Sequence, residues 1–328
     1  MKKRAILIMT YGSPNDYSFE GIADFFTNIR RGKRPKEEEI RKLYENYKKI
    51  NSSPLQKISK KTVELLKERI DIPIYFANKF SYPFIFNKIE EMENDKIEEC
   101  LCLILEPHYS IYSSMGYERF IKSKKIKFNI IKEWYKNPHL ISYWANAIHN
   151  IIKNLNPSEY RVIFSAHSVP IMATTCGDPY IKQIIDNVTI LKEKLKLKDE
   201  NFARVWQSES DIGMEWVKPD VIEYIKSEKN IKKNYIFVPI SFISDHIETL
   251  FDNDIRCYEE CKKLNINYFR PPSPNYNKKL IDALEEEIKK NINNNYTYKN
   301  NEKFANEMEI KKGEMPDFIK KILQKNKI

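Results

Sequence analysis

The sequence predicts an α/β protein with two similar domains, each a parallel sheet flanked by helices, around a central cleft. The first observation is that short apolar runs alternate with longer amphipathic segments, the pattern of a parallel sheet with helices on both faces. The second is that 328 residues exceed the usual size of one domain and can bury a sizeable core. The third is that the two halves of the chain resemble each other at corresponding points.

The expected elements follow from these apolar runs and amphipathic segments, taken in chain order. In the first half they are a strand at 5–9, helices at 19–29, 35–50 and 58–70, a strand at 74–77, a helix at 84–94 and a strand at 100–105. In the second half they are a strand at 161–165, a helix at 179–196, a strand at 202–207, a helix at 219–227, a strand at 235–239 and a helix at 278–291.

The two halves correspond at the ends of their first strands. The apolar run that leads to Tyr11 is mirrored by the run that leads to His167, and a turn with Ser and Pro follows each. We therefore expect an N-terminal α/β half at 1–150 and a C-terminal α/β half with the metal-binding residues at 151–291. A polar linker and a Lys-rich tail are expected at 292–328. Because ligands of such sheets bind beyond the carboxyl ends of the strands, Tyr11, His108 and His167 are candidate site residues.

Charge and hydropathy exclude several classes of protein. The 56 Lys and Arg against 46 Asp and Glu give a net charge of +10, but both signs mix along helical segments, which is typical of solvated faces. No nucleic-acid-binding motif is present, so we expect no nucleic-acid partner. No apolar run reaches the roughly 18–20 residues of a spanning helix, which predicts no transmembrane segment and a cytoplasmic location. The five cysteines include no C-x-x-C pair, which favours buried thiols over disulfides.

Two segments carry side chains that suit a metal ion. His167 leaves its strand where a ligand should bind. If Asp245 caps a helix, then Asp245, Glu248 and Asp252 lie at i, i+3 and i+7 on one face of that helix. A neutral imidazole on one wall and a row of carboxylates on another suit a divalent cation in transit. The alternative interpretation is a structural histidine and acidic residues that merely favour a helix N-terminus.

A series of short motifs in family order identifies a resemblance to a known family over residues 4–288. The motifs are Tyr11-Gly-Ser-Pro14, Asn28-Ile-Arg-Arg-Gly-Lys-Arg-Pro35, Ser53-Pro-Leu55, Pro107-His-Tyr-Ser110, Ser165-Ala-His-Ser-Val-Pro170, Gly177-Asp-Pro-Tyr180, Trp206-Gln-Ser208, Pro219-Asp220 and Asp245-His-Ile-Glu-Thr-Leu250. The sequence resembles the ferrochelatases, lyases of haem biosynthesis that insert Fe(II) into a porphyrin. The resemblance implies two similar chelatase-like α/β domains around a cleft.

The resemblance also implies catalytic and metal-binding residues. His167 matches the family histidine that binds iron, and Glu248 matches the glutamate opposite it. Inserting Fe(II) requires the removal of two pyrrole protons and of water from the metal, so a base and an exchangeable metal ligand are both needed. We assign metal delivery and proton acceptance to His167 and support from the other wall to Glu248. Tyr11 matches a tyrosine that sits at the metal on the opposite face of the porphyrin.

The coproporphyrin III branch of the family is indicated by Tyr11 and His108, because protoporphyrin enzymes usually carry Met and Gln at these two positions. The substrate of this branch has four propionates against two in protoporphyrin, so basic and hydroxyl groups have more to hold. The residues at positions that line the substrate pocket of this branch are Tyr11, Arg30, Asn46, Tyr47, Ser53 and Tyr117.

Two positions depart from the family pattern. Asn46 stands where the branch usually has Arg, and Arg256 stands where the family continues the acidic row. We interpret them as a compensated pair, which puts in doubt both propionate binding at Asn46 and an accessory divalent-ion site near Arg256. The interpretation predicts that Arg256→Glu alone lowers activity.

The resemblance implies Fe(II) as the substrate metal, and the number and spacing of the cysteines predict no iron–sulfur cluster. The implied partners are coproporphyrin III and transient protein partners of the haem pathway. Three alternatives stay open: a protoporphyrin IX ferrochelatase, a sirohydrochlorin chelatase, and a non-catalytic tetrapyrrole or metal carrier.

Overall fold

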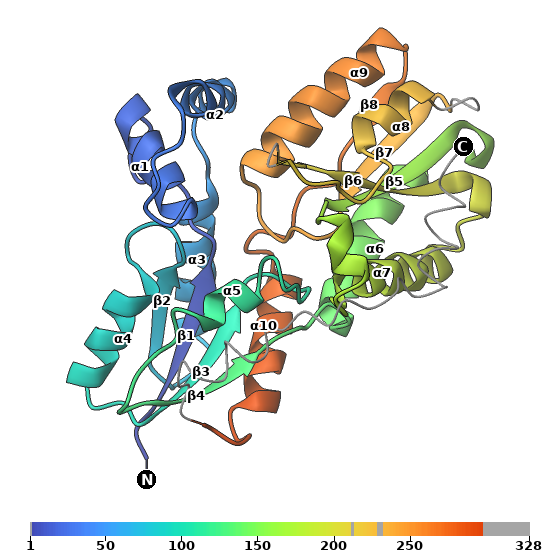
Figure 1. Cartoon of the computed structure of the whole chain (residues 1–328). Helices are drawn as coiled ribbons and strands as arrows, with labels where there is room; N and C mark the ends of the chain where they lie inside the picture. The colour runs from blue at the N-terminus through green and yellow to red at the C-terminus, as the bar shows by residue number, and fades with distance from the viewer. Residues whose placement is uncertain (1, 211–212, 228–231, 298–328) are drawn as a thin grey trace.

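Two parallel sheets of four strands each frame the molecule in the computed structural model, which describes residues 2–210, 213–227 and 232–297 (Figure 1). The first sheet has the order β2-β1-β3-β4, with β1 (Arg4–Thr10), β2 (Ile74–Asn78), β3 (Glu99–Ile104) and β4 (Lys127–Ile131). The second has the order β6-β5-β7-β8, with β5 (Tyr160–His167), β6 (Phe202–Gln207), β7 (Asn234–Pro239) and β8 (Asn267–Phe269). Because the two orders are equivalent, the predicted fold of two similar α/β domains is confirmed.

The helices lie mostly where amphipathic segments predict them. In the first half they are α1 (Phe19–Ile29), α2 (Glu37–Lys49), α3 (Leu55–Lys67), α4 (Ile85–Asn94), the short α5 (Met115–Glu118) and α6 (Pro138–Ile152). In the second half they are α7 (Tyr180–Leu195), α8 (Val221–Ser227), the π-helix η4 (Glu248–Cys257), α9 (Tyr258–Lys263) and α10 (Lys278–Asn291). Short 3₁₀ turns lie at η1 (Pro157–Glu159), η2 (Ile171–Thr174) and η3 (Asp199–Asn201).

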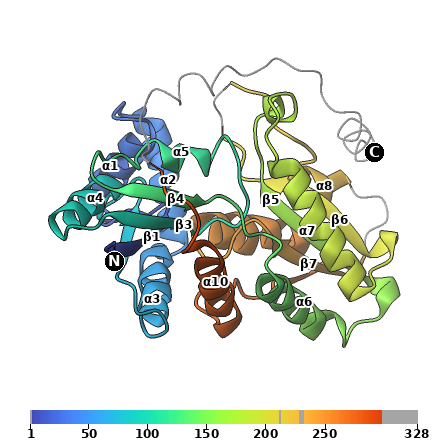
Figure 2. The same ribbon diagram turned by 90° about the horizontal axis from the view of Figure 1, so that it is seen from below.

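Within the described residues, the chain passes between the two halves twice. After β4, residues 132–137 lead to α6, which packs against α7 and β7 of the second half. After β8, residues 270–277 lead back to α10, which packs against α3, β3 and β4 of the first half and also against α6. Figure 2 shows α3, α10 and α6 side by side beneath the sheets. The last helix thus lies on the first sheet, and residue 150, the expected boundary, lies within α6.

Polar contacts also bind α10 and the residues after it to the first half. Arg69, two residues after α3, pairs with Asp282 and Glu285 on α10, at 2.8 and 3.2 Å. Beyond α10, an antiparallel bridge joins Thr297 to Phe128 at the edge of β4. The start of the predicted linker therefore runs along the first sheet, while the predicted tail at 298–328 lies outside the described residues.

One apolar core joins the two halves. It includes Ile8 of β1, Trp144 of α6, Phe164 of β5 and Leu284 of α10, all essentially inaccessible to solvent. Separate smaller clusters lie on the outer face of each sheet. The shared core fixes the carboxyl ends of β1 and β5 in relation to each other, and these ends carry the candidate site.

Candidate functional site

The central strands β1 and β5 occupy equivalent places in their sheets, and each leads to a predicted site residue. Tyr11 directly follows β1, and His167 is the last residue of β5. Glu248 begins η4, the helix that follows β7. Tyr11 is 39% exposed, and the side chains of His167 and Glu248 are 33% and 30% exposed. All three are accessible to a ligand.

The His167 ring is fixed by backbone contacts that leave one nitrogen available. Its Nδ1–H donates to the carbonyl of Ser168 at 2.6 Å, so the proton of the neutral ring lies on that nitrogen. Ser241 Oγ accepts from the backbone N–H of His167, and the hydroxyl of Tyr180 donates to its carbonyl. The remaining nitrogen, Nε2, faces Glu248 Oε1 at 3.5 Å.

Glu248 lies between two imidazoles. His246 Nε2 is 3.1 Å from Glu248 Oε2, and His246 Nδ1 donates to the carbonyl of Ser244 at 2.9 Å. Both rings therefore present an unprotonated Nε2 to the carboxylate when they are neutral, and lone pairs would face lone pairs. A proton or a metal ion relieves this repulsion. The sequence analysis assigns no role to His246, although it lies two residues before Glu248.

The pKa values of the pair agree with this picture. Burial alone lowers the pKa of His167, but the charge of Glu248 and the hydrogen bond to it outweigh burial and raise the pKa to about 9. Burial raises the pKa of Glu248, but the charge of His167 and hydrogen bonds to both imidazoles bring it well below its usual range. Without metal, His167 and Glu248 form an imidazolium–carboxylate pair at neutral pH.

The predicted row of three carboxylates is wrong for Asp245. The helix begins at Glu248, and no side chain caps its first turn. Asp245 instead accepts hydrogen bonds from Arg270 at 3.0 Å, Ser273 at 2.7 Å and Asn275 at 2.8 Å. These contacts bind its carboxylate to the segment after β8, so it does not extend the acidic face that starts at Glu248.

Asp252 and Arg256 form an ion pair four residues apart on η4. Arg256 Nη1 is 3.1 Å from Asp252 Oδ1, and Ser208 donates to the other oxygen of Asp252 at 2.5 Å. Burial raises the pKa of Asp252, and the nearby Arg256 opposes this shift. Among the described residues, no hydrogen bond or ion pair joins Arg256 to Asn46. The partner that balances Arg256 is therefore Asp252.

The wall that carries Tyr11 contains a buried lysine. Lys79 Nζ lies 5.9 Å from the ring centre of Tyr11, 5.0 Å from that of Phe80 and 4.6 Å from that of Tyr117. It donates to the carbonyl of Ser113 at 3.0 Å. Burial lowers the pKa of Lys79 to about 8, a value that still leaves its amine mostly protonated at neutral pH. An ammonium group therefore lies behind the ring of Tyr11.

Glu106 is the carboxylate of the same wall. Tyr117 is fully buried, and its hydroxyl donates to Glu106 Oε1 at 2.5 Å. Burial raises the pKa of Tyr11, and the charges of Glu248 and Glu106 raise it further. Since Glu248 belongs to the second half and Glu106 to the first, Tyr11 lies between carboxylates from both halves.

The other predicted substrate residues lie at the end of α1 and on α2 and α3. Arg30 follows α1 and pairs with Glu39. Tyr47 is buried, and its pKa is raised by burial and then by the charges of Tyr17, Glu248 and Tyr11, so it lies near the predicted metal-binding residues. Ser53 accepts from the N–H of Leu55 at the start of α3, and Asn46 is half-buried on α2.

Comparison with protein families decides the assignment. The family model described as Ferrochelatase matches residues 3–292. The chain belongs to the ferrochelatase family.

Curated relatives lie within the same family. Proteins named coproporphyrin III ferrochelatase from Streptococcus pneumoniae, strains Taiwan19F-14 and CGSP14, are each 50% identical to this chain. Each comparison covers 98% of this chain and 93% of the relative. Solved structures of SirB from Bacillus subtilis, one with Fe3+ and one, described as a sirohydrochlorin chelatase, with cobalt, match with a TM-score of 0.56. They cover 88% of this chain and 95% of SirB at 12% identity, which supports the fold alone.

His108 does not join the predicted metal-binding residues of this ferrochelatase-family chain. It is 2% exposed and its Nε2–H donates to Asn187 Oδ1 at 2.7 Å. Its ring stacks on Tyr135, and burial lowers its pKa to about 4. His108 is thus a neutral, buried residue between the loop after β3 and helix α7.

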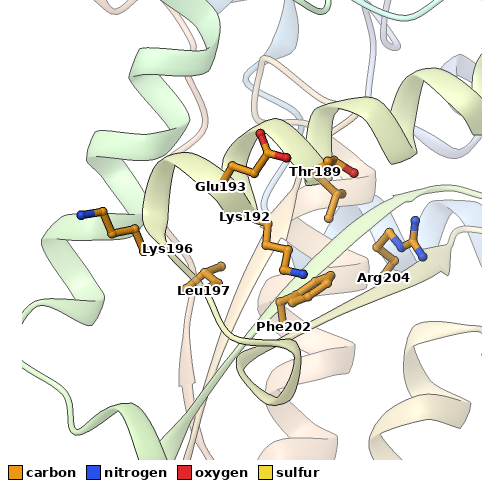
Figure 3. A pocket seen from close by; sticks show the side chains of 8 residues that line it. Thr189, Lys192, Glu193, Lys196, Leu197, Phe202 and Arg204 are labelled. Carbon is orange, nitrogen blue, oxygen red and sulfur yellow. The ribbon is translucent and has the colours of Figure 1, made fainter.

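A surface pocket lies elsewhere on this member of the ferrochelatase family. It has a volume of about 420 Å³, and Lys192, Phe202 and Arg204 line it where α7 meets β6 (Figure 3). In the part of the chain that the structure describes, no three His, Cys, Asp or Glu side chains form a cage for a metal ion. None of the described helices combines the length and hydropathy that a membrane-spanning segment needs.

Proposed function

We propose that this member of the ferrochelatase family inserts Fe(II) into coproporphyrin III, a step of haem biosynthesis. The observation that carries the proposal is the contact of His167 Nε2 with Glu248 Oε1 at 3.5 Å, on the wall that faces Tyr11. The 50% identity to proteins named coproporphyrin III ferrochelatase supports this choice of porphyrin. Each turnover joins one Fe(II) to the four nitrogens of the macrocycle and releases two pyrrole protons.

His167 and Glu248 exchange a proton for the metal in this mechanism. The Nε2 of His167 is the nitrogen that its Nδ1–H contact leaves free, so it binds Fe(II) or accepts a pyrrole proton. Glu248 neutralises either cation from across the 3.5 Å gap. Tyr11 is the further metal ligand on the opposite wall, and the ammonium of Lys79 stands behind its ring. The position of Lys79 favours metal entry from the Glu248 side, because like charges repel.

The porphyrin carboxylates are held by the first half of the chain. We assign the lining of the porphyrin pocket to the predicted set: Tyr11, Arg30, Asn46, Tyr47, Ser53 and Tyr117. Arg30 is the charged member of the set and the strongest candidate for a propionate. Tyr117 is fully buried and hydrogen-bonded to Glu106, so it acts by fixing the shape of this wall. A cytoplasmic location, transient haem-pathway partners and the lack of an iron–sulfur cluster belong to the same proposal.

Anaerobic turnover tests the proposed reaction. The protein is mixed with Fe(II) and an excess of coproporphyrin III, and the free-base absorption spectrum is followed. An enzyme converts many equivalents, whereas a carrier stops at one, and a slower rate with protoporphyrin IX identifies the branch. His167→Ala should abolish turnover, while His139→Ala, on the outer surface of α6, should keep it. A wild-type rate in His167→Ala contradicts the mechanism.

A further inference from the structure

Arg30 is already paired with a carboxylate of the chain itself. Its Nη2 lies 2.8 Å from Glu39 Oε1, and its guanidinium lies over the ring of Phe26 at 5.1 Å. Both charged side chains are 37% exposed, so the pair is open to solvent and to a ligand. The arrangement holds the guanidinium in one orientation without a substrate.

Glu39 is fixed by the helix on which it lies. It belongs to the first turn of α2, and its second oxygen, Oε2, accepts from the backbone N–H of Lys36 at 3.0 Å. One oxygen therefore holds the start of α2 while the other holds Arg30. A carboxylate anchored in this way loses less rotamer freedom in the ion pair than an untethered surface side chain would.

The end of α1 belongs to the wall of Tyr11. Asn28 Nδ2 donates to the carbonyl of Phe80 at 3.1 Å, and the Phe80 ring packs edge-on against Tyr11 with ring centres 4.8 Å apart. The charge of Arg31 helps lower the pKa of Lys79, which lies behind Tyr11. Arg30 thus stands beside the residues assigned to the porphyrin.

We propose that Glu39 is a positioning residue that occupies Arg30 in place of a porphyrin propionate. The inference rests on the proposed function, in which Arg30 binds a propionate. When the porphyrin binds, its propionate replaces the carboxylate of Glu39 at Arg30. Arg30 therefore has a carboxylate partner, and stays ordered, with and without the porphyrin. Glu39 competes with the substrate and with the product, which carries the same propionates, and it therefore weakens binding of both and speeds release.

The test measures the binding of metal-free coproporphyrin III by fluorescence quenching, without Fe(II). Glu39→Gln should tighten binding about two- to fivefold, the range expected for an exposed ion pair. Gln keeps an oxygen for the N–H of Lys36, so the start of α2 is preserved. In an Arg30→Met background, the same Glu39→Gln change should have no effect. The tetramethyl ester of coproporphyrin III, which has no carboxylates, should bind wild type and Glu39→Gln equally.

The matched control is Glu38→Gln, which removes the same charge one residue away on the exposed face of α2. Equal tightening by Glu38→Gln and Glu39→Gln would indicate a general charge effect and overturn the inference. Unchanged binding in Glu39→Gln, with weaker binding in Arg30→Met, would overturn the inference and leave the Arg30 contact standing. Unchanged binding in Arg30→Met would overturn both the inference and that contact, whereas the iron-insertion assay tests the reaction separately.

Discussion

Two imidazole nitrogens face the carboxylate of Glu248, one at each oxygen. A proton or a metal ion relieves the repulsion between the facing lone pairs. In the metal-free protein a proton on His167 fills this role, and Fe(II) can fill it when it arrives. In the proposed mechanism, the pair is therefore a site where a metal and a proton replace each other. This exchange matches a reaction that consumes a metal ion and releases protons.

A titration of metal-free protein tests this description. The pKa of His167 should lie near 9, above its ordinary value of 6.5, because the charge of Glu248 outweighs burial. In Glu248→Gln the burial of the ring dominates, and the pKa should fall to 6.5 or below. NMR of the imidazole signals against pH measures both values. A His167 pKa near 6.5 in the wild-type protein would contradict the imidazolium–carboxylate pair.

The same pair makes stability depend on pH. The folded-state pKa of His167 is raised, so its stabilising contribution is fully present below pH 6.5 and is lost as pH rises through about 9. The melting temperature should therefore fall between pH 6.5 and 9, and fall less in Glu248→Gln. Calorimetry at constant ionic strength measures the difference. Identical pH profiles for the two proteins would contradict the linkage.

Sequence patterns predicted some site residues and missed others for physical reasons. His167 and Glu248 lie in distinctive motifs at strand and helix ends, where ligands bind. His246 is two residues from Glu248 and could have been found as a second imidazole on the same turn. Lys79 and Glu106 follow different strands, and only the parallel pairing of those strands with β1 brings them to Tyr11.

At the scale of elements, the turn after β1 places Tyr11. Gly12 has φ +92°, and a Cβ there would lie 2.4 Å from Ser81 Oγ and 3.0 Å from Asn78 Cβ. Gly177 also has a positive φ, +77°, but a Cβ there would meet nothing within 4 Å. The two positions separate the cost of backbone strain from the cost of a steric clash.

Alanine at each position measures these costs. Gly12→Ala should lower the free energy of unfolding by about 2–5 kcal/mol, the sum of left-handed strain and overpacking. Gly177→Ala should lower it by about 1–2 kcal/mol, from strain alone. Urea denaturation gives both values. Equal losses for the two variants would show that the clash with Ser81 and Asn78 is relieved at no cost.

On η4, the charge of Arg256 balances that of Asp252, which lies one turn after Glu248. Arg256→Glu would place a second carboxylate beside Asp252 in a half-buried position, where like charges repel. We expect kcat for iron insertion to fall several-fold, with a loss of about 1–2 kcal/mol in the free energy of unfolding. Lys263→Glu on α9, an exposed position, is the control. An unchanged rate in Arg256→Glu would show that the pair has no part in activity.

The elements differ in how far their sequences predict them. The central strands β1, β3, β5 and β7 are continuous apolar runs, so burial on both faces predicts them. The edge strands β4 and β8 are short and partly polar, and pairing with a neighbour defines them. The α-helical spacing misplaced Asp245 because η4 begins only at Glu248, and Asp245 lies before it, hydrogen-bonded to Arg270.

At the scale of the whole molecule, one face of α7 joins the two halves. Asp178 accepts from Ser110 and Ile111, and Gln183 accepts from the N–H of Tyr109. His108 adds a further hydrogen bond between the halves, to Asn187 on α7, and we call this set of hydrogen bonds the seam. The loop after β3 is therefore bound to the second half by buried hydrogen bonds, whose loss is costly because no water replaces them.

Protonation of His108 should weaken this seam in acid. Its folded-state pKa is lowered to about 4, so its contribution is fully present above pH 6.5 and is lost as pH falls towards 4. The expected loss in the free energy of unfolding is about 3 kcal/mol near pH 4, because each unit of pKa shift corresponds to about 1.4 kcal/mol. In His108→Gln, which keeps a donor for Asn187, the free energy of unfolding should fall less between pH 6.5 and 4.5. Parallel curves from urea denaturation would rule out this role.

The described chain connects the two halves through two segments, residues 132–137 and 270–277. Rotation of one half against the other would separate side chains of the core that both halves share, so these buried contacts hold the two halves in one arrangement. Near the site, α2 contacts η4, where Lys49 Nζ lies 5.5 Å from the ring centre of Phe251. Tyr11 and His167 therefore keep one alignment across the two halves, and a porphyrin would meet a preformed site instead of one that assembles around it.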